Sequence, residues 1–537
     1  MSLQVKYVDV PLGAKETASI TTTSCQSFGE AQDLITGAEN ILWATLEPNG
    51  WALDGTREIL GDSPSGVGWW SLHRSGADGR FAQIPVIRIQ FPRTYTATGI
   101  TFDFWAALGY WCAEVSVSWY RGQTLLQTVT GFPDGPHWIL EQIVEDFDWI
   151  EIQLLATNIP QSFAKIRQIQ IGQIAVFEGD ELVQVSLLQE VDPSLCELSV
   201  DTLSVSIRDR KGRKLLPQRN QIMQLYEDGK LLASHCITDS SRDGKWDYNF
   251  RCQSSISKLE DTYLGGIVRS TVQEEIEKLL SDMPYYVDSR YGQMALNGYL
   301  PVCTRREALQ QIAFAIGAVV TTHPDGTIEL KAPQEELQWD FKDDSIFADG
   351  KCTKKAPVSQ VQLTAHSYTP GEERETLLNG EIIDEESVLY LFSKPHYAYE
   401  ITDGLLTGWG DNWVTITANG PVTLTALPYN YTTRVYTKTN NQAVAEAWGN
   451  TVTVKDATLV NSRNAPQILE RLFAYYNLQN VLQQEVVVSG QQIGQVVRSA
   501  NPWGSATQGY LIRMENNYTG SSHTAEVTIR GKEVQQI

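Results

Sequence analysis

The chain has 537 residues, of which 42% are hydrophobic and 20% are charged. This length suggests several domains, and the composition is that of folded rather than disordered protein. The 42 basic and 64 acidic side chains give a formal charge of -22, which argues against a surface built to hold nucleic-acid phosphates. Solubility alone explains an acidic balance; the alternative is a surface along which DNA slides without sticking.

The first residues, MSLQVKYVDVPLGAKET, contain no apolar core of signal-peptide length, and no window approaches 18 apolar residues. We therefore expect neither signal-peptide export nor a membrane-spanning helix. The seven cysteines are dispersed and form no CxxC pair, which is typical of a reduced chain folded in the cytoplasm.

Residues 1–178 hold nine of the 15 tryptophans and several runs in which apolar and polar residues alternate. Such period-two runs, separated by Gly, Pro, Asn or Asp turns, predict antiparallel sheets packed as a β-sandwich or jelly roll. Examples are PVIRIQF (85–91), GITFDFW (99–105) and AEVSVSWY (113–120).

Aromatic side chains in this region are candidates for glycan contact, because sugar rings stack on aromatic faces. Adjacent aromatics on one strand cannot all face the same core, so we expect some to be exposed. The alternative is that they fill the core of the sandwich or a protein interface. The candidates are Trp69, Trp70, Trp105, Tyr110 and Trp111.

Residues 179–270 predict a small β-domain. Two alternating runs in QIMQLYEDGKLLASHCITD (221–239) are separated by Asp-Gly, a strong hairpin signal because Gly adopts positive φ at little cost. The strand WDYNFRCQS (246–254) follows. The segment GQQIGQVVRSANPWGSATQGYLIRMENNYTGSSHTAEVTIRG (490–531) repeats the order of a Gln-Ile start, strand, turn, strand, turn and strand. The chain therefore either uses one β-module twice or contains two unrelated meanders of similar pattern.

Between these segments, residues 271–340 predict a small α/β domain. Thr271 with Glu274 and Thr304 with Glu307 fit the capping box, and a Pro-Asp-Gly turn predicts a following hairpin. Residues 341–537 then predict a second β-domain with an inserted β segment at about 375–460. Asn464 and Pro466 mark the start of a helix at 465–480, which we expect to cover the last sheet.

Catalytic and metal motifs are not evident. The seven histidines lack HxH or HxxxH spacing, and no phosphate-binding GxxxxGK[ST] or GxSxG occurs, so we expect no metal and no cofactor. Paired carboxylates are the remaining enzymatic option, since glycoside hydrolases need two acids. The candidates alternate with apolar residues like a solvated strand face, which favours a protein that is not an enzyme: Glu141, Glu145, Asp146 and Asp148.

The run NQIMQLYEDGKLLASHCITDSSRDGKWDYNFRCQSSISKLEDTYLGGIV resembles the first β-domain of tail hub proteins, the central baseplate proteins of tailed phages and phage-like particles. The C-terminal meander is similar to the other β-domain of that family, and TRREALQQIAFAIGAVVTTHPDGTIEL to its α/β insertion. The resemblance covers about residues 180–537. Residues 1–178 resemble galactose-binding-like jelly-roll modules of tail proteins, which a compact hub lacks.

The resemblance implies a mainly β fold, with a jelly roll followed by two similar barrel-like hub domains and an α/β insertion. It implies a virion tail protein that assembles as a homotrimer, so that three chains with two domains each join a sixfold tail tube to a threefold spike or fibre. The expected partners are a tube or distal tail protein above, a spike, fibre or tape-measure protein below, and DNA that passes unbound. The alternatives are a glycan-binding receptor protein and a cell-wall glycoside hydrolase. Residues in the two meanders are the candidate tube and subunit contacts: Gln221, Tyr226, Asp228, Trp246, Gln492, Trp503 and Tyr510.

Overall fold

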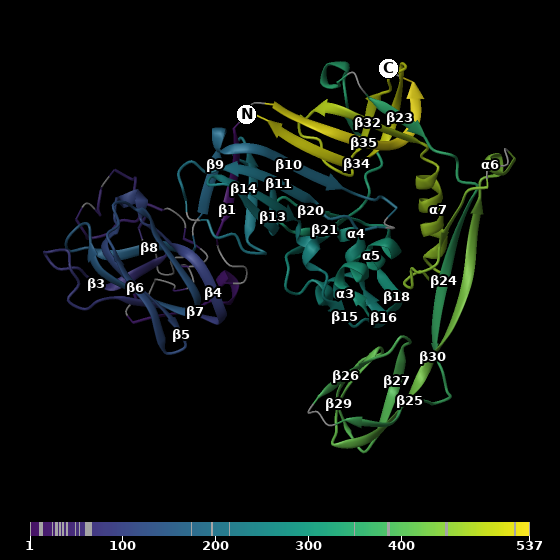
Figure 1. Ribbon diagram of the computed structural model, residues 1–537, viewed down its shortest axis with the longest axis horizontal. Helices are drawn as coiled ribbons and strands as arrows, with labels where there is room; N and C mark the ends of the chain where they lie inside the picture. Colours follow the sequence, from purple (N-terminus) through teal and green to yellow (C-terminus); the bar gives the residue numbers. More distant parts are fainter. Residues whose placement is uncertain are drawn as a thin grey trace.

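The computed structural model describes residues 2–9, 14–23, 25–26, 31, 34, 37–38, 41–48, 50–52, 54–59, 67–172, 174–194, 197–213, 215–347, 350–383, 387–445, 449–519 and 522–535. The chain is mostly β, with 57% strand and 11% helix, as the sequence predicts. Its parts lie side by side: a sandwich, a large central sheet, a helical region below that sheet, and a long two-stranded arm that ends in a small β-domain (Figure 1).

The sandwich is one seven-stranded sheet that folds over a core rich in aromatic and branched side chains. Its two longest strands, β4 and β7, bend at bulges between Gln90 and Gly99, which allows one sheet to form both layers. The elements are α1 (Ala14–Thr17), β2 (Ser19–Thr22), β3 (Trp69–Arg74), β4 (Val86–Phe104), β5 (Cys112–Arg121), β6 (Thr124–Gly131), β7 (His137–Thr157) and β8 (Phe163–Ile171).

The sandwich is inserted into the central sheet rather than attached in front of it. Strand β1 (Leu3–Val8) lies between β9 (Ile174–Glu178) and β12 (Ile222–Glu227), antiparallel to both. The chain therefore starts in the central sheet, leaves it to build the sandwich, and returns. The sequence predicts residues 1–178 as one domain, but β1 belongs to the central sheet instead of the sandwich. Its six residues pair with β12, more than 200 positions away, and no local sequence pattern reveals such a pairing.

The central sheet has 13 strands and contains both predicted hub β-domains. Its main path is β23-β32-β35-β34-β10-β11-β14-β13-β12-β1-β9, so the two domains share one sheet instead of forming separate barrels. Besides β1, β9 and β12, its strands are β10 (Leu182–Glu190), β11 (Thr202–Arg208), β13 (Lys230–Asp243), β14 (Asp247–Gln253), β22 (Leu337–Asp340), β23 (Lys351–Lys354), β32 (Asn480–Val487), β33 (Val496–Ala500), β34 (Ser505–Thr519) and β35 (Ser522–Gln535).

The α/β domain packs its helices against two small two-stranded sheets and one three-stranded sheet. Both predicted capping boxes are present, and Gly317 ends α5 with φ 79°. The elements are β15 (Thr262–Tyr263), β16 (Gly266–Thr271), α3 (Val272–Leu279), β17 (Tyr285–Val287), α4 (Ser289–Gly292), β18 (Ala295–Leu300), β19 (Cys303–Thr304), α5 (Arg305–Ile316), β20 (Val319–Thr322) and β21 (Ile328–Lys331).

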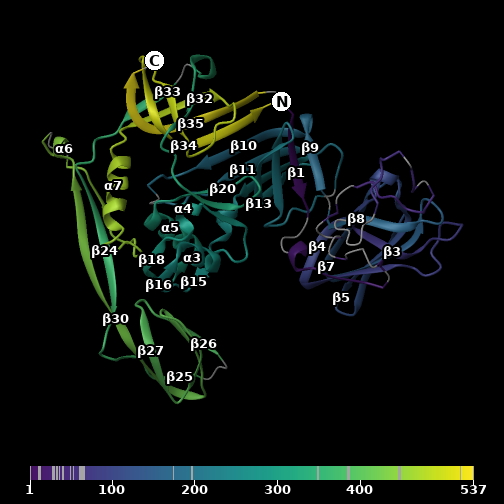
Figure 2. The same cartoon turned by 180° about the vertical axis from the view of Figure 1, so that it is seen from behind.

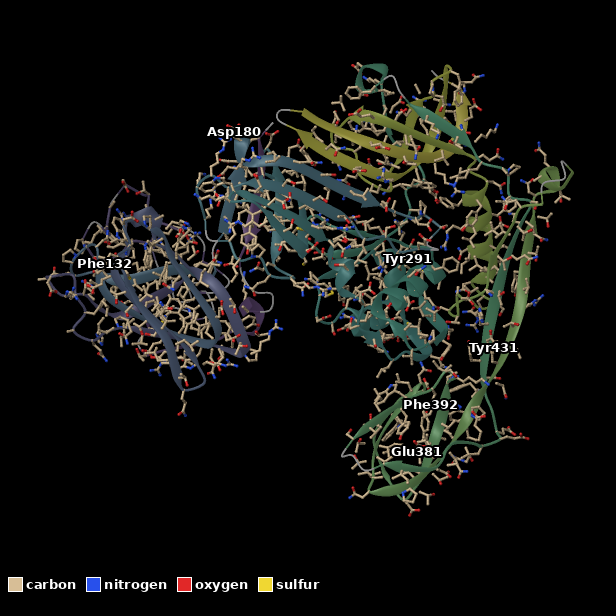
Figure 3. All side chains as sticks on the ribbon, viewed as in Figure 1. Phe132, Asp180, Tyr291, Glu381, Phe392 and Tyr431 are labelled. Atoms are coloured by element: carbon tan, nitrogen blue, oxygen red, sulfur yellow. The ribbon has the colours of Figure 1, made fainter. Side chains whose placement is uncertain are left out.

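The arm is formed by β24 (Gln360–Pro370) and β30 (Gly420–Thr439), with β31 (Thr451–Val454) beside β24 and α6 (Asn441–Ala445) near its upper end. Although it lies within the region predicted as the second β-domain, β24 does not join the central sheet, since it pairs with β30 and β31. The arm carries a distal domain with its own apolar core, far from the sandwich in Figure 3, where Phe132 and Glu381 mark the two. The distal strands are β25 (Glu375–Ile383), β26 (Val388–Leu391), β27 (His396–Thr402), β28 (Leu405–Trp409) and β29 (Trp413–Thr417).

Helix α7 (Ala465–Tyr476) is shorter than the predicted 465–480 and packs mainly on the arm strands β24 and β30, with α5 as a further neighbour. Only its last turn reaches the C-terminal strands, where Arg530 lies over the ring of Tyr475 at 4.3 Å. The predicted cap is also different: Asn464 makes no capping bond, and its Oδ1 accepts from the Asn461 N–H at 2.8 Å. Figure 2 shows α7 alongside the arm, between it and the α/β domain.

Candidate assembly interface

The two β-modules of the central sheet have the same connectivity. In the first module the chain runs through β10, β11, β12, β13 and β14, which lie in the order β10-β11-β14-β13-β12. In the second it runs through β23, β32, β33, β34 and β35, which lie in the order β23-β32-β35-β34-β33. Every one of these contacts is antiparallel. Identical order in five strands is not a general property of β-meanders, so the predicted repetition is observed.

A β-bulge fixes the residue equivalence between the modules. The ladder of β13 with β14 is interrupted between Ile237 and Asp239, and that of β34 with β35 between Leu511 and Arg513. Ile237 is therefore equivalent to Leu511. The row of cross-strand neighbours through these residues is apolar in both modules: Leu187, Leu203, Cys252 and Ile237 in the first, Cys352, Leu482, Ile529 and Leu511 in the second.

This equivalence corrects the alignment made on the two Gln-Ile starts. By strand pairing, Ile222 faces Cys236 and is equivalent to Val496, which faces Tyr510. Ile493 lies before the strand. The shift lies before the strand, because residues 493–495 separate Gln492 from Val496, whereas Gln221 directly precedes Ile222.

The modules meet where β10 pairs with the second half of β34, from Val185 opposite Tyr518 to Glu190 opposite Arg513. Arg513 Nε lies 3.2 Å from Glu190 Oε1 across this seam. The first half of β34 pairs with β33 instead, so one edge of this long strand is shared between its own module and the other. The seam is a continuous backbone ladder.

Two side chains of the second module add contacts across the seam between β10 and β34. Tyr518 is buried within the core of the first module, and its ring lies 4.3 Å from that of His523. His523 Nδ1 lies 3.0 Å from Glu227 Oε1, which belongs to the first module. Burial lowers the pKa of His523, against the opposing charge of Glu227. The two modules are therefore joined by side-chain packing as well as by the backbone ladder.

Gln221, predicted as a tube or subunit contact, is buried and cannot serve as one in this chain. Its Oε1 accepts from Tyr7 Oη and from the Gln218 N–H, both at 2.7 Å, and its Nε2 donates to Asp9 Oδ1 at 2.5 Å. Asp9 Oδ2 in turn accepts from the Thr98 N–H of the sandwich at 2.9 Å. Gln221 thus joins the sandwich to the first module.

The other predicted contacts are at least partly accessible. Asp228 is exposed in the β12–β13 turn with φ 48°, followed by Gly229 with φ 81°, and Tyr226 is half-buried beneath Lys6. Trp246 is 37% and Trp503 58% exposed. Gln492 is exposed, and Tyr510 is half-buried near Tyr475. These residues are spread over several turns and form no single surface of contacting residues.

Four of the five candidate glycan residues are buried, so the expectation that they are exposed is wrong. Trp69, Trp70, Trp105 and Tyr110 are each at most 2% exposed, and only Trp111 is half-buried. These aromatic side chains are buried because residues that precede β3 cover them. Trp105 Nε1 donates to Ile41 O at 2.9 Å, and Tyr110 Oη donates to Pro48 O.

Trp70 and Tyr110 instead enclose a buried ion pair. Lys165 Nζ lies 4.8 Å from the Trp70 ring centroid and 3.8 Å from that of Tyr110. Its ammonium group contacts Glu47 Oε2, and both side chains are fully shielded from solvent. Burial lowers the pKa of Lys165 to about 8, although the Glu47 charge opposes this shift. These aromatics therefore have a structural role in the sandwich.

The acidic candidates for hydrolysis do not converge. Asp148 accepts two hydrogen bonds from the Gly122 N–H at 2.9 Å, Asp146 pairs with Arg121 at 3.5 Å, and Glu141 and Glu145 are exposed on β7. In the part of the chain that the structure describes, no group of three or more His, Cys, Asp or Glu residues could hold a metal ion. Among the same residues, no helix is long and apolar enough to cross a membrane.

Sequence reasoning missed the unpaired strand edges that flank the repeated modules. In the first module β12 covers only the first half of β13, up to Cys236, and residues 239–243 are exposed. Strand β23 is the terminal strand of the sheet, and its outer edge pairs with no described strand. An edge depends on which strands come together across the fold, and the only sequence signal is the polar composition of SSRDGK and KCTKK.

No protein-family model matches the chain, and no curated protein sequence matches it. Solved structures similar to it include the 43 kDa tail protein of prophage MuSo2 from Shewanella oneidensis (10% identity, 66% of this chain and 95% of that one, TM-score 0.40). A tail protein from Neisseria meningitidis MC58 is 11% identical over 67% of this chain and 94% of that one, with a TM-score of 0.42. A family 32 CBM from C. perfringens NanJ, solved with galactose, is 10% identical over 31% of this chain and 98% of that one, with a TM-score of 0.21. The solved structures that are similar to the chain thus include phage tail and baseplate proteins, at similarities too low to establish a shared function.

Proposed function

We propose that this protein is a structural hub of a phage or phage-like tail, which assembles as a homotrimer to join a sixfold tube to a threefold spike or fibre. The observation that carries the proposal is the pair of modules with one connectivity inside one sheet. Three chains closed about a threefold axis present six equivalent modules, which a single module per chain could not do.

The two faces of the central sheet support a role as a wall. One face packs on the apolar cores of the modules. The other carries polar side chains, among them Ser204, Ser206, Asn249, Gln483, Glu485, Glu515 and Glu526. In a ring this face lines the central channel, where hydroxyl, amide and carboxylate groups separate the cations that could hold DNA phosphates. The cations on this face include Arg208, Arg251, Lys351 and Arg513. Arg208 pairs with Asp247, and Arg513 pairs with Glu190 and Glu515.

Neither a glycan-binding nor a hydrolytic role has comparable support. The aromatic residues that suggested glycan stacking are buried, and the acidic residues that suggested hydrolysis make separate local contacts. We therefore assign the sandwich no ligand. Its position at one end of the molecule, beyond β1 and β9, keeps it outside the ring wall (Figure 1).

Native mass spectrometry and particle imaging of the full chain test this function. We expect three subunits per particle and a ring with sixfold pseudo-symmetry in projection at the level of the modules. A chain that stays monomeric at all concentrations, or rings with a subunit number other than three, would contradict the proposal. In virions, antibody labelling should place the protein at the tip of the tail.

A further inference from the structure

Two strand edges without partners occupy equivalent places in the two modules. In the second module, residues 513–518 of β34 pair with β10. The equivalent residues of the first module, from Asp239 to the end of β13, pair on one side with β14 and on the other side with no described strand. The strand equivalent to β10 is β23, and its outer edge is also unpaired within the described chain. The end of β13 therefore lacks the neighbour that β34 has in β10, and β23 is the strand equivalent to that neighbour.

Both edges are accessible. Every residue from Asp239 to Asp243 is exposed, as are Lys351, Thr353, Lys354 and Lys355. Backbone N–H and C=O groups along such edges form hydrogen bonds with any strand of matching length and register. The Ser240 N–H, which donates to Asp239 Oδ1 at 2.9 Å, would exchange this acceptor for a backbone carbonyl of the added strand. Within one chain β23 and β13 are separated by the strands β32, β35, β34, β10, β11 and β14 of the central sheet. Their free edges therefore cannot pair with each other.

We propose that β23 of one chain pairs antiparallel with Asp239–Asp243 of β13 in a second copy of this chain, in the register that β10 uses on β34. This inference rests on the proposed trimer and names the contact that closes it. Each chain gives one β23 and accepts another, so three chains form a continuous sheet without free edges between modules.

The register follows from the bulge equivalence. Arg513 corresponds to Asp239 and Asn517 to Asp243, while Glu190 corresponds to Lys355 and Ser186 to Lys351. Because Glu190 faces Arg513 and Ser186 faces Asn517, Lys355 should face Asp239 and Lys351 should face Asp243.

Charge supports this register independently of topology. At the seam within the chain, the acid Glu190 on β10 meets the base Arg513 on β34 at 3.2 Å. At the proposed contact both signs are reversed, with a base on β23 and an acid on β13. The second facing pair, Lys351 with Asp243, is also of opposite charge. A shift of two residues that keeps the same faces would place Lys355 opposite Ser241 and Lys351 opposite Lys245, and both pairs would be lost.

The contact differs from the internal seam in one respect. Tyr518, which anchors the seam in the core of the first module, corresponds to Gly244, which has no side chain to insert. The contact between chains therefore depends on backbone hydrogen bonds and exposed ion pairs. It should be reversible and weaken with salt.

Disulfide cross-linking tests the register. The Val191 N–H donates to Ile512 O at 2.9 Å, so Glu190 and Arg513 form the adjacent non-hydrogen-bonded pair. In such a pair the Cβ atoms lie about 4.5–5.5 Å apart, close enough for a disulfide after small adjustments. The full chain with Asp239→Cys and Lys355→Cys, in a Cys352→Ser background, should form covalent dimers and trimers on mild oxidation, visible on a non-reducing gel.

The matched control combines Asp239→Cys with Lys354→Cys, since neighbouring residues of a strand point to opposite faces. It should form no more cross-link than either single-cysteine variant. A native trimer in which the first pair cross-links no better than this control overturns the proposed pairing and leaves the trimeric function standing. Cross-linked chains that extend beyond three subunits support the pairing and overturn the ring. A protein that is monomeric at all concentrations and forms no cross-link overturns both.

Discussion

Buried charge in the sandwich is concentrated in Lys165 and Glu47, whose ion pair lies beneath Trp70 and Tyr110. Glu47 also accepts from the Phe163 N–H at 2.7 Å, so it links the segment around residue 47 to strand β8. Two charges taken out of water stabilise a fold only while both are present. This pair therefore decides whether that segment stays folded over the aromatic cluster.

We expect Glu47→Gln to lower the free energy of unfolding of the sandwich by about 3–5 kcal/mol, because it leaves the Lys165 ammonium buried and unpaired. The double variant Glu47→Gln with Lys165→Met removes both charges and should recover most of that loss. Calorimetry of the full chain measures both. Equal melting of the single and double variants would show that the ion pair does not control this region.

Two buried groups of the first module should respond to pH in opposite directions. Burial lowers the pKa of His235 to about 4, so the folded state resists the proton that the unfolded state binds near pH 6.5. The contribution of neutral His235 to the free energy of unfolding is complete above pH 6.5 and is lost as the pH falls toward 4.

Burial raises the pKa of Asp201 to about 7, so the folded state keeps a proton that the unfolded state releases near pH 4. Its contribution is present at low pH and is lost as the pH rises toward 7.

The variants His235→Leu and Asp201→Asn separate these effects. Between pH 6.5 and pH 4.5 we expect His235→Leu to gain stability relative to the wild type, on the order of 2–3 kcal/mol. Asp201→Asn should gain relative to the wild type over the opposite change, from pH 4.5 to pH 7. Denaturant unfolding at these pH values gives the differences. Parallel curves for wild type and variants would refute the assignment.

Single residues were predictable where their signal is local. The capping boxes at Thr271 and Thr304, and the Asp228–Gly229 turn, depend on neighbours within three positions and are present as predicted. The burial of Trp69, Trp70, Trp105 and Tyr110 was not predictable, because it depends on contacts with residues distant in sequence, such as Ile41 and Pro48.

Among the elements, the loop between β28 and β29 has a function that its sequence does not indicate. It docks the distal domain on the α/β domain: Asn412 Nδ2 donates to Leu264 O at 2.8 Å and to Leu300 O at 2.9 Å, and the Ile267 N–H donates to Asp411 Oδ2 at 2.8 Å. Asn412 is fully buried in this contact. The arm formed by β24 and β30 is therefore held at both ends.

Asn412→Ala should release this docking, because it leaves two carbonyl groups without their donor, each at a cost of about 1–3 kcal/mol. Hydrogen exchange should become faster at the Ile267 amide and along β16, while the cores of the two modules stay protected. The control is Asn379→Ala, an exposed asparagine on β25 of the same domain. Unchanged exchange in Asn412→Ala, or equal effects of both variants, would contradict this role.

Strand segments and their hairpins could be predicted, because alternation and turn residues are properties of short windows. Pairing across the fold could not. The strand order shared by the modules, the seam of β10 on β34 and the free edges all depend on contacts between segments that are far apart in sequence. The two modules share few identical residues, so only strand pairing establishes their equivalence.

At the scale of the whole molecule, the proposed ring depends on charges that should be interchangeable. Asp239→Lys places two bases opposite each other at each of three contacts, and Lys355→Asp places two acids there. We expect either variant to raise the concentration for half-assembly at least about tenfold, and their combination to restore it, because opposite charges face each other again. Native mass spectrometry at low salt measures this. Failure of the combination to restore assembly would mean that these residues do not face each other.

The insertion of the sandwich between β1 and β9 has a mechanical consequence. Its two connections leave the central sheet from neighbouring antiparallel strands, at Val8 and Ile174. A force that pulls the sandwich away from the central sheet is thus carried along β1, in shear against six residue pairs with β12, and by the Asp9–Gln221 contact beside it. Hydrogen bonds loaded in shear must break together, so tension on the sandwich is transmitted to the central sheet through β1.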